Sequence, residues 1–424
     1  MTKLKRMAIN KWIAIFFLFN PAITLSQEII DQTSSTIVEP FLISGKLADG
    51  ETKLISELTL KPGDDQLEME LGFIKFLRSI ERMAQTLYRF GPNESLAMGQ
   101  IPFLRLPVPR NPDPDKVQLQ DVRAMIQQLI DDLDQVEAML AKVESDKVKL
   151  PIKVMRIRLD INGDGQATDK EILGPVLNQY LGVRRSASDQ VVELMDRSIH
   201  FDRSDVDWMR GYCCLLRAMG EVILAYDQTE LWEVTAHRFF AKGQSKFKFL
   251  VEEQTDDNDF WIELRDVIAG IHNIQFPVQE PQRLKKAHRH LLDTISHSRT
   301  MWKRINAEVD DDQEWIPSPT QSNPFTDVRI TRQMHSAWNK FLNEGEDLLE
   351  GKLLIPFWRG TDERRGVNLY KVFHEPQKFD LVLWIHGSGA APFLEFGKCS
   401  DPDTWNEFQR IFRGNFFGFA VWFN

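Results

Sequence analysis

Two long stretches of the chain carry apolar residues at alternating steps of three and four, the spacing that places them on one face of an α-helix. The first stretch covers residues 67–87, and the second covers residues 117–143. Gly91-Pro92 follows the first stretch, and a proline-rich segment separates it from the second. Helices with such stripes bury them most simply by packing against each other as a hairpin. We therefore predict a mainly α-helical fold built on this pair.

Helical periodicity continues through much of the remaining chain. Further helices are expected at residues 204–226, 229–242, 257–271, 281–307 and 327–350. Ser204 with Asp207 three residues later is typical of a capping box at the start of the first of these helices. At 424 residues the chain exceeds the usual size of one hydrophobic core. We predict a helical domain at residues 63–308, a linker at 309–326 and a C-terminal α/β region at 327–424.

Two parts of the sequence favour β-structure. In residues 27–62, apolar residues flank Asp49-Gly50, a dipeptide typical of tight turns, which predicts a β-hairpin near the N-terminus. In the C-terminal region, we expect a buried strand at Phe379–Ile385, a short helix at residues 404–412 and a final strand at Phe416–Phe423. The expected fold class is therefore mainly α, with a bundle-like helical core and minor β pieces.

The N-terminal residues have the layout of a secretory signal peptide. Basic residues precede an apolar run from Trp12 to Phe19, and a stretch of small residues ends at Ser26. The apolar run is shorter than the about 20 residues needed to cross a bilayer, and no later run is long enough. We predict a signal peptide at residues 1–26 and export to the periplasm or the extracellular space, with no membrane span after cleavage.

Charge and cysteine content exclude some classes of function. The formal net charge is −10, which does not suit a protein whose main role is binding nucleic acid through its phosphates. The 3 cysteines are too few for a disulfide framework. Cys213 and Cys214 lie in an expected helix, where neighbours do not bridge. A bridge from either one to Cys399 and three buried free thiols both stay open.

Residues 160–171 contain oxygen-bearing side chains at the spacing that a calcium ion requires. Ca²⁺ binds six to eight oxygen atoms, so a short loop must direct alternate side chains inward and reverse its backbone midway. Gly165 at the sixth position allows that reversal. The expected ligands are Asp160, Asn162 and Asp164 at positions one, three and five, the backbone carbonyl of Gln166 at seven, Thr168 at nine and a bidentate Glu171 at twelve.

This pattern resembles the EF-hand family at every ligand-bearing position. The resemblance covers residues 152–181, and it implies a short incoming helix from near Pro151 and an outgoing helix interrupted at Gly174-Pro175. No second loop in the sequence has the pattern, which indicates a single hand and a structural Ca²⁺ site of modest affinity. The alternative is an Asx-rich turn that caps a helix without metal.

Other constellations resemble catalytic or metal sites less closely. His386 to Gly389 follow an apolar run as a hydrolase nucleophile does, but no glycine stands two residues before Ser388 and no histidine follows it. His290 and His297 share a helix face, and Glu233 and His237 are four residues apart, outside any HExxH motif. We assign no catalytic residue and no cofactor other than Ca²⁺.

The sequence therefore favours an exported calcium-binding protein whose ligand is the calcium ion. Two alternatives stay open. One is a hydrolase-type enzyme with a site near the C-terminal region, which a concave pocket with convergent polar groups would favour. The other is a helical interaction scaffold that uses residues 67–87 and 117–143, which an exposed apolar patch would favour.

Overall fold

The protein is mainly α-helical with small antiparallel sheets, as predicted. The computed structural model describes residues 36–93, 106, 108–174, 195–252, 260–325, 329–359, 362 and 364–412. The predicted signal peptide and the predicted strand Phe416–Phe423 lie outside these residues, as does most of the helix predicted to follow residue 171.

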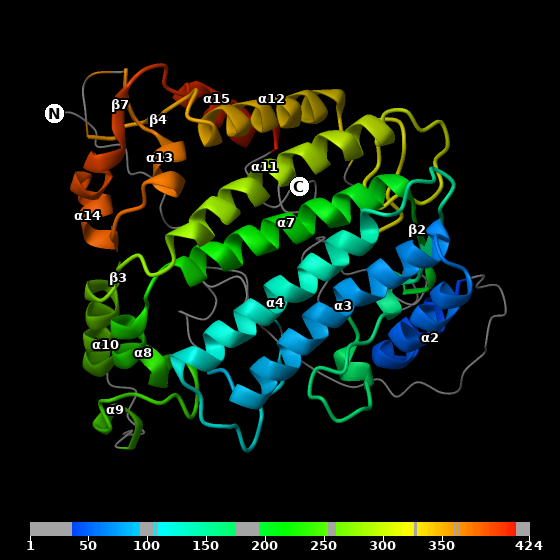
Figure 1. The fold of residues 1–424 in the computed structure, drawn as a ribbon, viewed down its shortest axis with the longest axis horizontal. Coiled ribbons are helices and arrows are strands. Elements are labelled where there is room, and N and C mark those ends of the chain that lie inside the picture. The colour runs from blue at the N-terminus through cyan, green and yellow to red at the C-terminus, as the bar shows by residue number, and fades with distance from the viewer. Residues whose placement is uncertain are drawn as a thin grey trace.

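Four long helices lie side by side and form the centre of the molecule (Figure 1). They are α3 (Asp65–Phe90), α4 (Leu119–Leu140), α7 (Arg203–Ala225) and α11 (Pro281–Ile305). Helix α7 packs along α11 on one side and along α4 on the other, and α4 packs against α3. Most residues of the apolar stripes predicted for residues 67–87 and 117–143 are buried in one hydrophobic cluster, and α3 and α4 confirm the predicted helix pair.

Side-chain caps define where these helices begin. Asp64 accepts hydrogen bonds from the backbone N–H groups of Gln66 and Leu67, both at 3.1 Å, at the start of α3. At the start of α7 the capping residue is Asp202 rather than the predicted Ser204. The reason is that Asp205, at the third helical position, accepts a bond from the Asp202 backbone N–H at 3.0 Å and completes a capping box two residues earlier.

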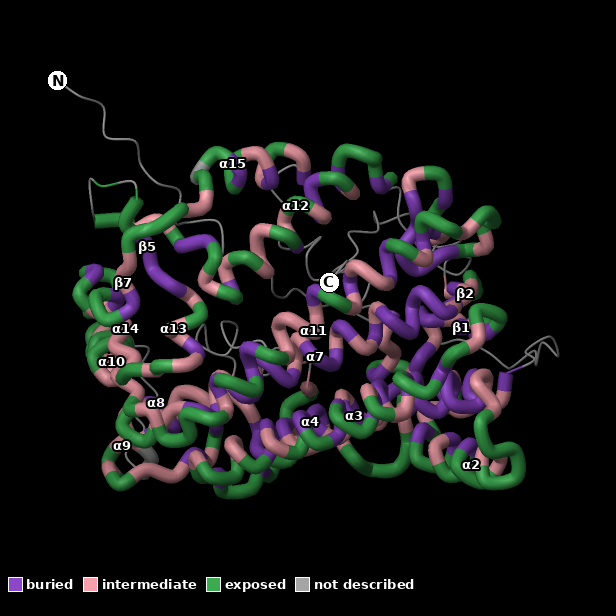
Figure 2. Tube along the Cα trace, turned by 45° about the horizontal axis from the view of Figure 1, so that its top comes forward, coloured by how far each residue is buried: buried purple, intermediate pink, exposed green. Residues whose placement is uncertain are grey.

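Shorter helices surround this central row. Helix α2 (Leu47–Leu60) lies beside α3, α1 (Glu39–Ser44) contacts α2, and α12 (Arg332–Leu349) packs on α11. Helices α8 (Thr229–Phe239), α9 (Phe249–Glu252) and α10 (Phe260–His272) gather at one end (Figure 1). Buried residues concentrate along the inner sides of the long helices, as Figure 2 shows.

The β-structure of the described residues consists of three small sheets. In the helical part, β1 (Leu150–Ile152) pairs antiparallel with β2 (Ile199–Phe201). In the C-terminal part, β6 (Phe379–Asp380) pairs with β3 (Gln275–Phe276), and β5 (Arg365–Val367) lies between β4 (Ile355–Pro356) and β7 (Leu394–Phe396). The helical elements there are α13 (Leu369–His374), α14 (Leu381–His386), η5 (Ser388–Phe393) and α15 (Pro402–Ile411). Helix α15 confirms the predicted helix at residues 404–412.

The predicted hairpin in residues 27–62 is wrong in its described part, because residues 39–60 form α1 and α2. Asp49-Gly50 lies inside α2 and not in a turn. Leu47 and Leu54, seven residues apart, are both buried on one face of this helix. A Cβ atom at Gly50 would lie 2.6 Å from Cδ1 of Ile74, so this glycine permits close packing of α2 on α3.

The predicted buried strand Phe379–Ile385 is also wrong beyond its first two residues. The Asp380 side chain accepts a hydrogen bond from the Leu383 backbone N–H at 3.0 Å and so starts α14. Gly387, with φ of 96°, ends this helix in the left-handed conformation. Val382 and Ile385 are 50% and 70% exposed, so the segment is a surface helix.

The segment predicted as a linker, residues 309–326, is packed against the helical core where it is described. Trp315, Ile316 and Phe325 belong to the main hydrophobic cluster. The Asn323 side-chain amide donates to the backbone carbonyls of Glu314 and Trp315, at 3.1 and 2.9 Å. Three phenylalanines of the C-terminal region belong to the same cluster, namely Phe373, Phe408 and Phe412.

The contact between α3 and α4 predicts opposite effects for one chemical change at two helical glycines. A Cβ atom at Gly72 would lie 2.3 Å from Cδ2 of the buried Leu140, whereas at Gly345 in α12 the nearest atom would be 3.7 Å away. We expect Gly72→Ala to lower the free energy of unfolding by about 1–3 kcal/mol through overpacking. Gly345→Ala should raise it by about 0.5–1 kcal/mol through helix propensity. Urea unfolding measures both, and shifts of the same sign would contradict the α3–α4 contact.

Candidate functional site

Residues 160–171 form a loop whose two ends lie side by side. The Leu159 N–H donates to the Glu171 carbonyl at 3.1 Å, the Leu173 N–H donates to the Ile157 carbonyl at 2.8 Å, and Arg158 forms an antiparallel bridge with Ile172. The loop is therefore closed at its base by paired extended backbone.

The incoming helix predicted from near Pro151 is wrong. Its residues form β1 and a single 3-10 turn, η3 (Val154–Arg156). From Ile157 to Ile161 buried and partly exposed residues alternate, which is the period of extended backbone and not of a helix. The loop ends in the 3-10 turn η4 (Asp169–Glu171), and of the residues after it the structure describes only Ile172, Leu173 and Gly174 before residue 195.

The first half of the loop folds around the carboxylate of Asp160. Its two oxygens accept hydrogen bonds from the N–H groups of Gly163 and Gly165, at 2.9 and 3.0 Å. Both glycines have left-handed backbones, with φ of 73° and 82°, so the chain reverses at the predicted place. Asn162 and Asp164 make similar turns, accepting from backbone N–H groups two residues ahead at 2.9 and 2.8 Å.

Glu171 ties the two ends of the loop together. Only 5% of its surface is exposed, and one carboxylate oxygen accepts from the Ile161 N–H at 2.9 Å. The other oxygen accepts from both the backbone N–H and the hydroxyl of Thr168, each at 2.8 Å. This carboxylate therefore already satisfies donors from both halves of the loop, and Gln166 is exposed at the tip.

The structure brings some of the six predicted ligand residues together and leaves others apart. Thr168 contacts Glu171, and the Asn162 amide donates to Asp164 at 2.9 Å. The carboxylates of Asp160, Asp164 and Glu171 do not form a group. Among the described residues, two other trios have ligand atoms that all lie within 4.8 Å of one another, namely Asp202–Glu308–Glu314 and Cys214–His290–Asp293.

The loop is fixed to two helices. The Asp160 backbone N–H donates to the buried Glu81 carboxylate of α3 at 2.9 Å, and the Gln85 amide donates to the Asp160 carbonyl at 2.8 Å. Burial raises the pKa of Glu81. The Arg158 guanidinium donates to the Ile43 carbonyl at the end of α1 at 2.6 Å. The loop therefore contacts α3 directly, and the residue two positions before it contacts the end of α1.

A polar groove of about 780 Å³ lies beside the loop, between α3 and α4, with Asn162 and Gly163 in its wall. Four of its charged side chains form two ion pairs within the groove wall. Arg82 contacts Asp132 at 2.9 Å, and Lys75 contacts Glu51 at 2.9 Å. These pairs leave the four charges compensated within the groove.

The carboxylates of Asp202, Glu308 and Glu314 meet where α7 begins and α11 has just ended. Burial, followed by the charge of Asp202, raises the pKa of Glu308 to about 7. Burial raises the pKa of Glu314 to about 8, with further contributions from Asp202 and Glu308. Sequence reasoning missed this group because Asp202 is about a hundred residues from Glu308 and Glu314 and meets them only in the folded chain.

The histidines singled out in the sequence have different surroundings. His297 lies 3.9 Å from a Glu137 carboxylate oxygen, whereas His290 lies beside Cys214 and Asp293. His237 pairs with Asp266 at 3.1 Å and not with Glu233. Burial lowers the pKa of both His290 and His297.

The structure also shows the residues on which the two alternatives, a hydrolase and an interaction scaffold, depend. His386 Nδ1 lies 3.1 Å from the Ser388 hydroxyl, within one turn at the surface where both side chains are exposed. The apolar stripes of α3 and α4 are buried, so they do not offer a scaffold surface. Exposed apolar side chains occur instead on α10 and α14.

No protein-family model matches this chain, and comparisons with curated proteins and with solved structures gave no match. The described helices include none that is both long enough and apolar enough to cross a membrane. The chemistry of the described residues is therefore the basis for any function.

The raised pKa values of Glu308 and Glu314 predict that the free energy of unfolding falls as pH rises from about 5 to 8. Folded Glu308 and Glu314 keep their protons up to about pH 7 and 8, whereas the unfolded chain releases them near 4.5. The folded state thus binds more protons across this range, and each upward step in pH favours unfolding. Glu314→Gln should flatten the dependence by on the order of 1–2 kcal/mol in urea unfolding at pH 5.5 and 8.5.

The exposed Glu375→Gln serves as the control and should leave the pH dependence unchanged. An equally steep loss of stability in the Glu314 variant would show that this carboxyl is ionised in the folded protein.

Proposed function

We propose that the protein is an exported calcium-binding protein in which Ca²⁺ at residues 160–171 stabilises the junction between the loop, α1 and α3. The observation that carries the proposal is the reversal of the loop around Asp160, with Gly163 and Gly165 in the left-handed conformation. This reversal occurs in a sequence that has calcium ligands at positions one, three, five and twelve.

The hydrogen bonds within the loop are compatible with an ion. A carboxylate has about four lone-pair sites, and those of Asp160 and Asp164 accept only two hydrogen bonds each. Glu171 is different, because it accepts bonds from both halves of the loop. Calcium would compete there with the Thr168 hydroxyl, so binding exchanges existing bonds for ion–oxygen bonds and yields a modest net gain.

The expected magnitude suits a structural role. Extracellular calcium modules bind with dissociation constants of about 0.1–1 mM. At about 1 mM calcium and a dissociation constant of about 0.1 mM, binding adds about 1.4 kcal/mol to the free energy of unfolding. That amount is enough to order the loop against Glu81 and Ile43, and too small to hold a whole domain together.

Calcium should therefore raise the melting temperature of the purified protein relative to the same protein in chelator. Asp164→Asn removes one charge from an exposed ligand and should lower the calcium affinity by about tenfold, because affinity follows the ligand charge. Glu171→Gln should lower it further. Titration calorimetry measures the affinity, and thermal melts measure the stabilisation.

Glu314→Gln is the matched control, since it alters an acidic side chain outside the loop and should leave the calcium response intact. If only this variant lost the calcium response, calcium would bind at Asp202, Glu308 and Glu314 and not in the loop. No heat and no change in the melting temperature with wild-type protein would reject calcium binding altogether.

Export is proposed from the leader-like residues 1–26. When the full chain is produced in a host with a general secretory pathway, the exported protein should begin at Gln27. Intact-mass measurement of the protein recovered outside the cytoplasm checks this. Protein that stays in the cytoplasm with Met1 to Ser26 attached would contradict it.

A further inference from the structure

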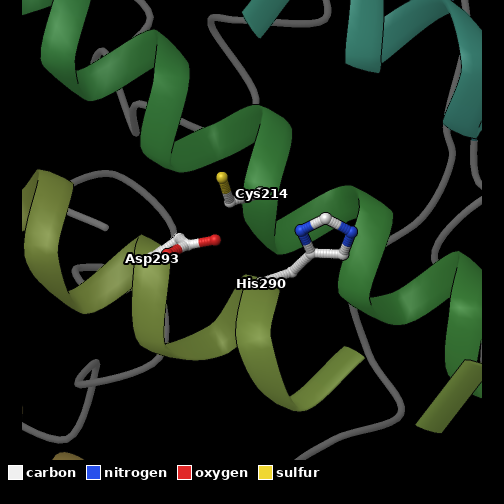
Figure 3. A group of neighbouring side chains, drawn as sticks. All are labelled: Cys214, His290 and Asp293. Carbon is white, nitrogen blue, oxygen red and sulfur yellow. The ribbon is translucent and has the colours of Figure 1, made fainter. Parts of the chain in front are cut away.

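Three side chains with metal-binding chemistry meet at the interface of α7 and α11. Cys214 extends from α7, and His290 and Asp293 extend toward it from α11 (Figure 3). One ligand atom from each residue lies within 4.8 Å of the others. His290 and Asp293 are three residues apart, which places them on the same face of the helix.

The group is buried at its cysteine and partly exposed at its other two members. Cys214 is 1% exposed, and His290 and Asp293 are partly buried. The Nδ1 atom of His290 is buried and has no hydrogen-bond partner among the described residues. No hydrogen bond within the described structure therefore has to be broken for this nitrogen atom to bind a ligand.

We propose that Cys214, His290 and Asp293 bind a thiophilic divalent metal ion of the zinc class, with a water molecule completing the coordination. Thiolate, imidazole and carboxylate are the three side-chain ligands that Zn²⁺ uses in proteins. Ca²⁺ requires six or more oxygen atoms, so this site is chemically distinct from the loop at residues 160–171.

The charges around the group are compatible with a dication. The Cys214 thiolate and the Asp293 carboxylate together balance two positive charges. The neighbouring Arg217 is paired with Asp134, so its charge is already compensated. Arg217 also donates a hydrogen bond to the Cys214 sulfur at 3.4 Å, and such a bond orients a metal-ligating thiolate.

The ligands are held by the most extensive helix–helix contact of the fold, that between α7 and α11. Side chains on packed helices are positioned more precisely than side chains on loops. A metal ion here would link the two central helices directly. The free thiol of Cys214, which the structure shows without a disulfide, keeps the sulfur available as a ligand.

Cobalt titration of the full chain, freed of metal with chelator, tests the site. Co²⁺ should bind with one equivalent and produce a thiolate-to-cobalt charge-transfer band, and one equivalent of Zn²⁺ should remove this band. Cys214→Ser should abolish the band and weaken Zn²⁺ binding by more than the about 10–100-fold of an outer-sphere change. Cys213→Ser is the matched control, because it alters a neighbouring buried thiol outside the group and should keep the band.

Circular dichroism shows whether Cys214→Ser folds. If it does not, His290→Gln and Asp293→Asn test the site in its place. Both side chains are partly exposed, and each variant should weaken Co²⁺ binding. Asp164→Asn in the calcium loop should leave the cobalt titration unchanged. Absence of the band in wild-type protein, or an equal band in a folded Cys214→Ser variant, would overturn the proposal.

Discussion

The mutual burial of apolar faces along α3, α4, α7 and α11 is the constraint on which the rest of the structure depends. The helices pack so closely on α3 that only glycine fits at two contacts, Gly50 of α2 against Ile74 and Gly72 of α3 against Leu140 of α4. The row of long helices also supplies the rigid positions for both proposed ion sites. The loop at residues 160–171 attaches to α3 through Glu81 and Gln85, and the cysteine group lies between α7 and α11.

The long helices were predictable because their signal is local. A stripe of apolar residues repeats over many turns, so one misread residue does not change the assignment. The wrong predictions, the hairpin and the buried strand, arose where a short motif is compatible with two kinds of secondary structure. Asp49-Gly50 is typical of a hairpin turn, but Gly50 serves a helix crossing near Ile74. Residues 381–385 are as apolar as a buried strand, but they form a surface helix. The Asp380 side chain caps this helix by accepting a hydrogen bond from the Leu383 N–H.

The two proposed ion sites differ in the same way, because the residues of one are neighbours in the sequence and those of the other are not. The proposed calcium pattern is visible in the sequence because its candidate ligands lie within twelve consecutive residues, although the segment before the loop is extended backbone and a 3-10 turn and not the predicted helix. The group around Cys214 could not be predicted, because its ligands come from two helices whose relative register only the folded protein defines. The sequence did contain its parts, a cysteine within a helix and His290 three residues before Asp293, but not their proximity.

The positions of the two proposed sites imply different behaviour toward their ions. The calcium loop lies at the edge of the fold, and without an ion Glu171 still satisfies the N–H groups of Ile161 and Thr168. Its ion can therefore exchange without disturbing the core. The site at Cys214 is in the centre of the helix row, and loss of its ion leaves the buried Nδ1 of His290 without a partner. Since α7 and α11 together supply its ligands, we expect binding of this ion to be coupled to the packing of these two helices.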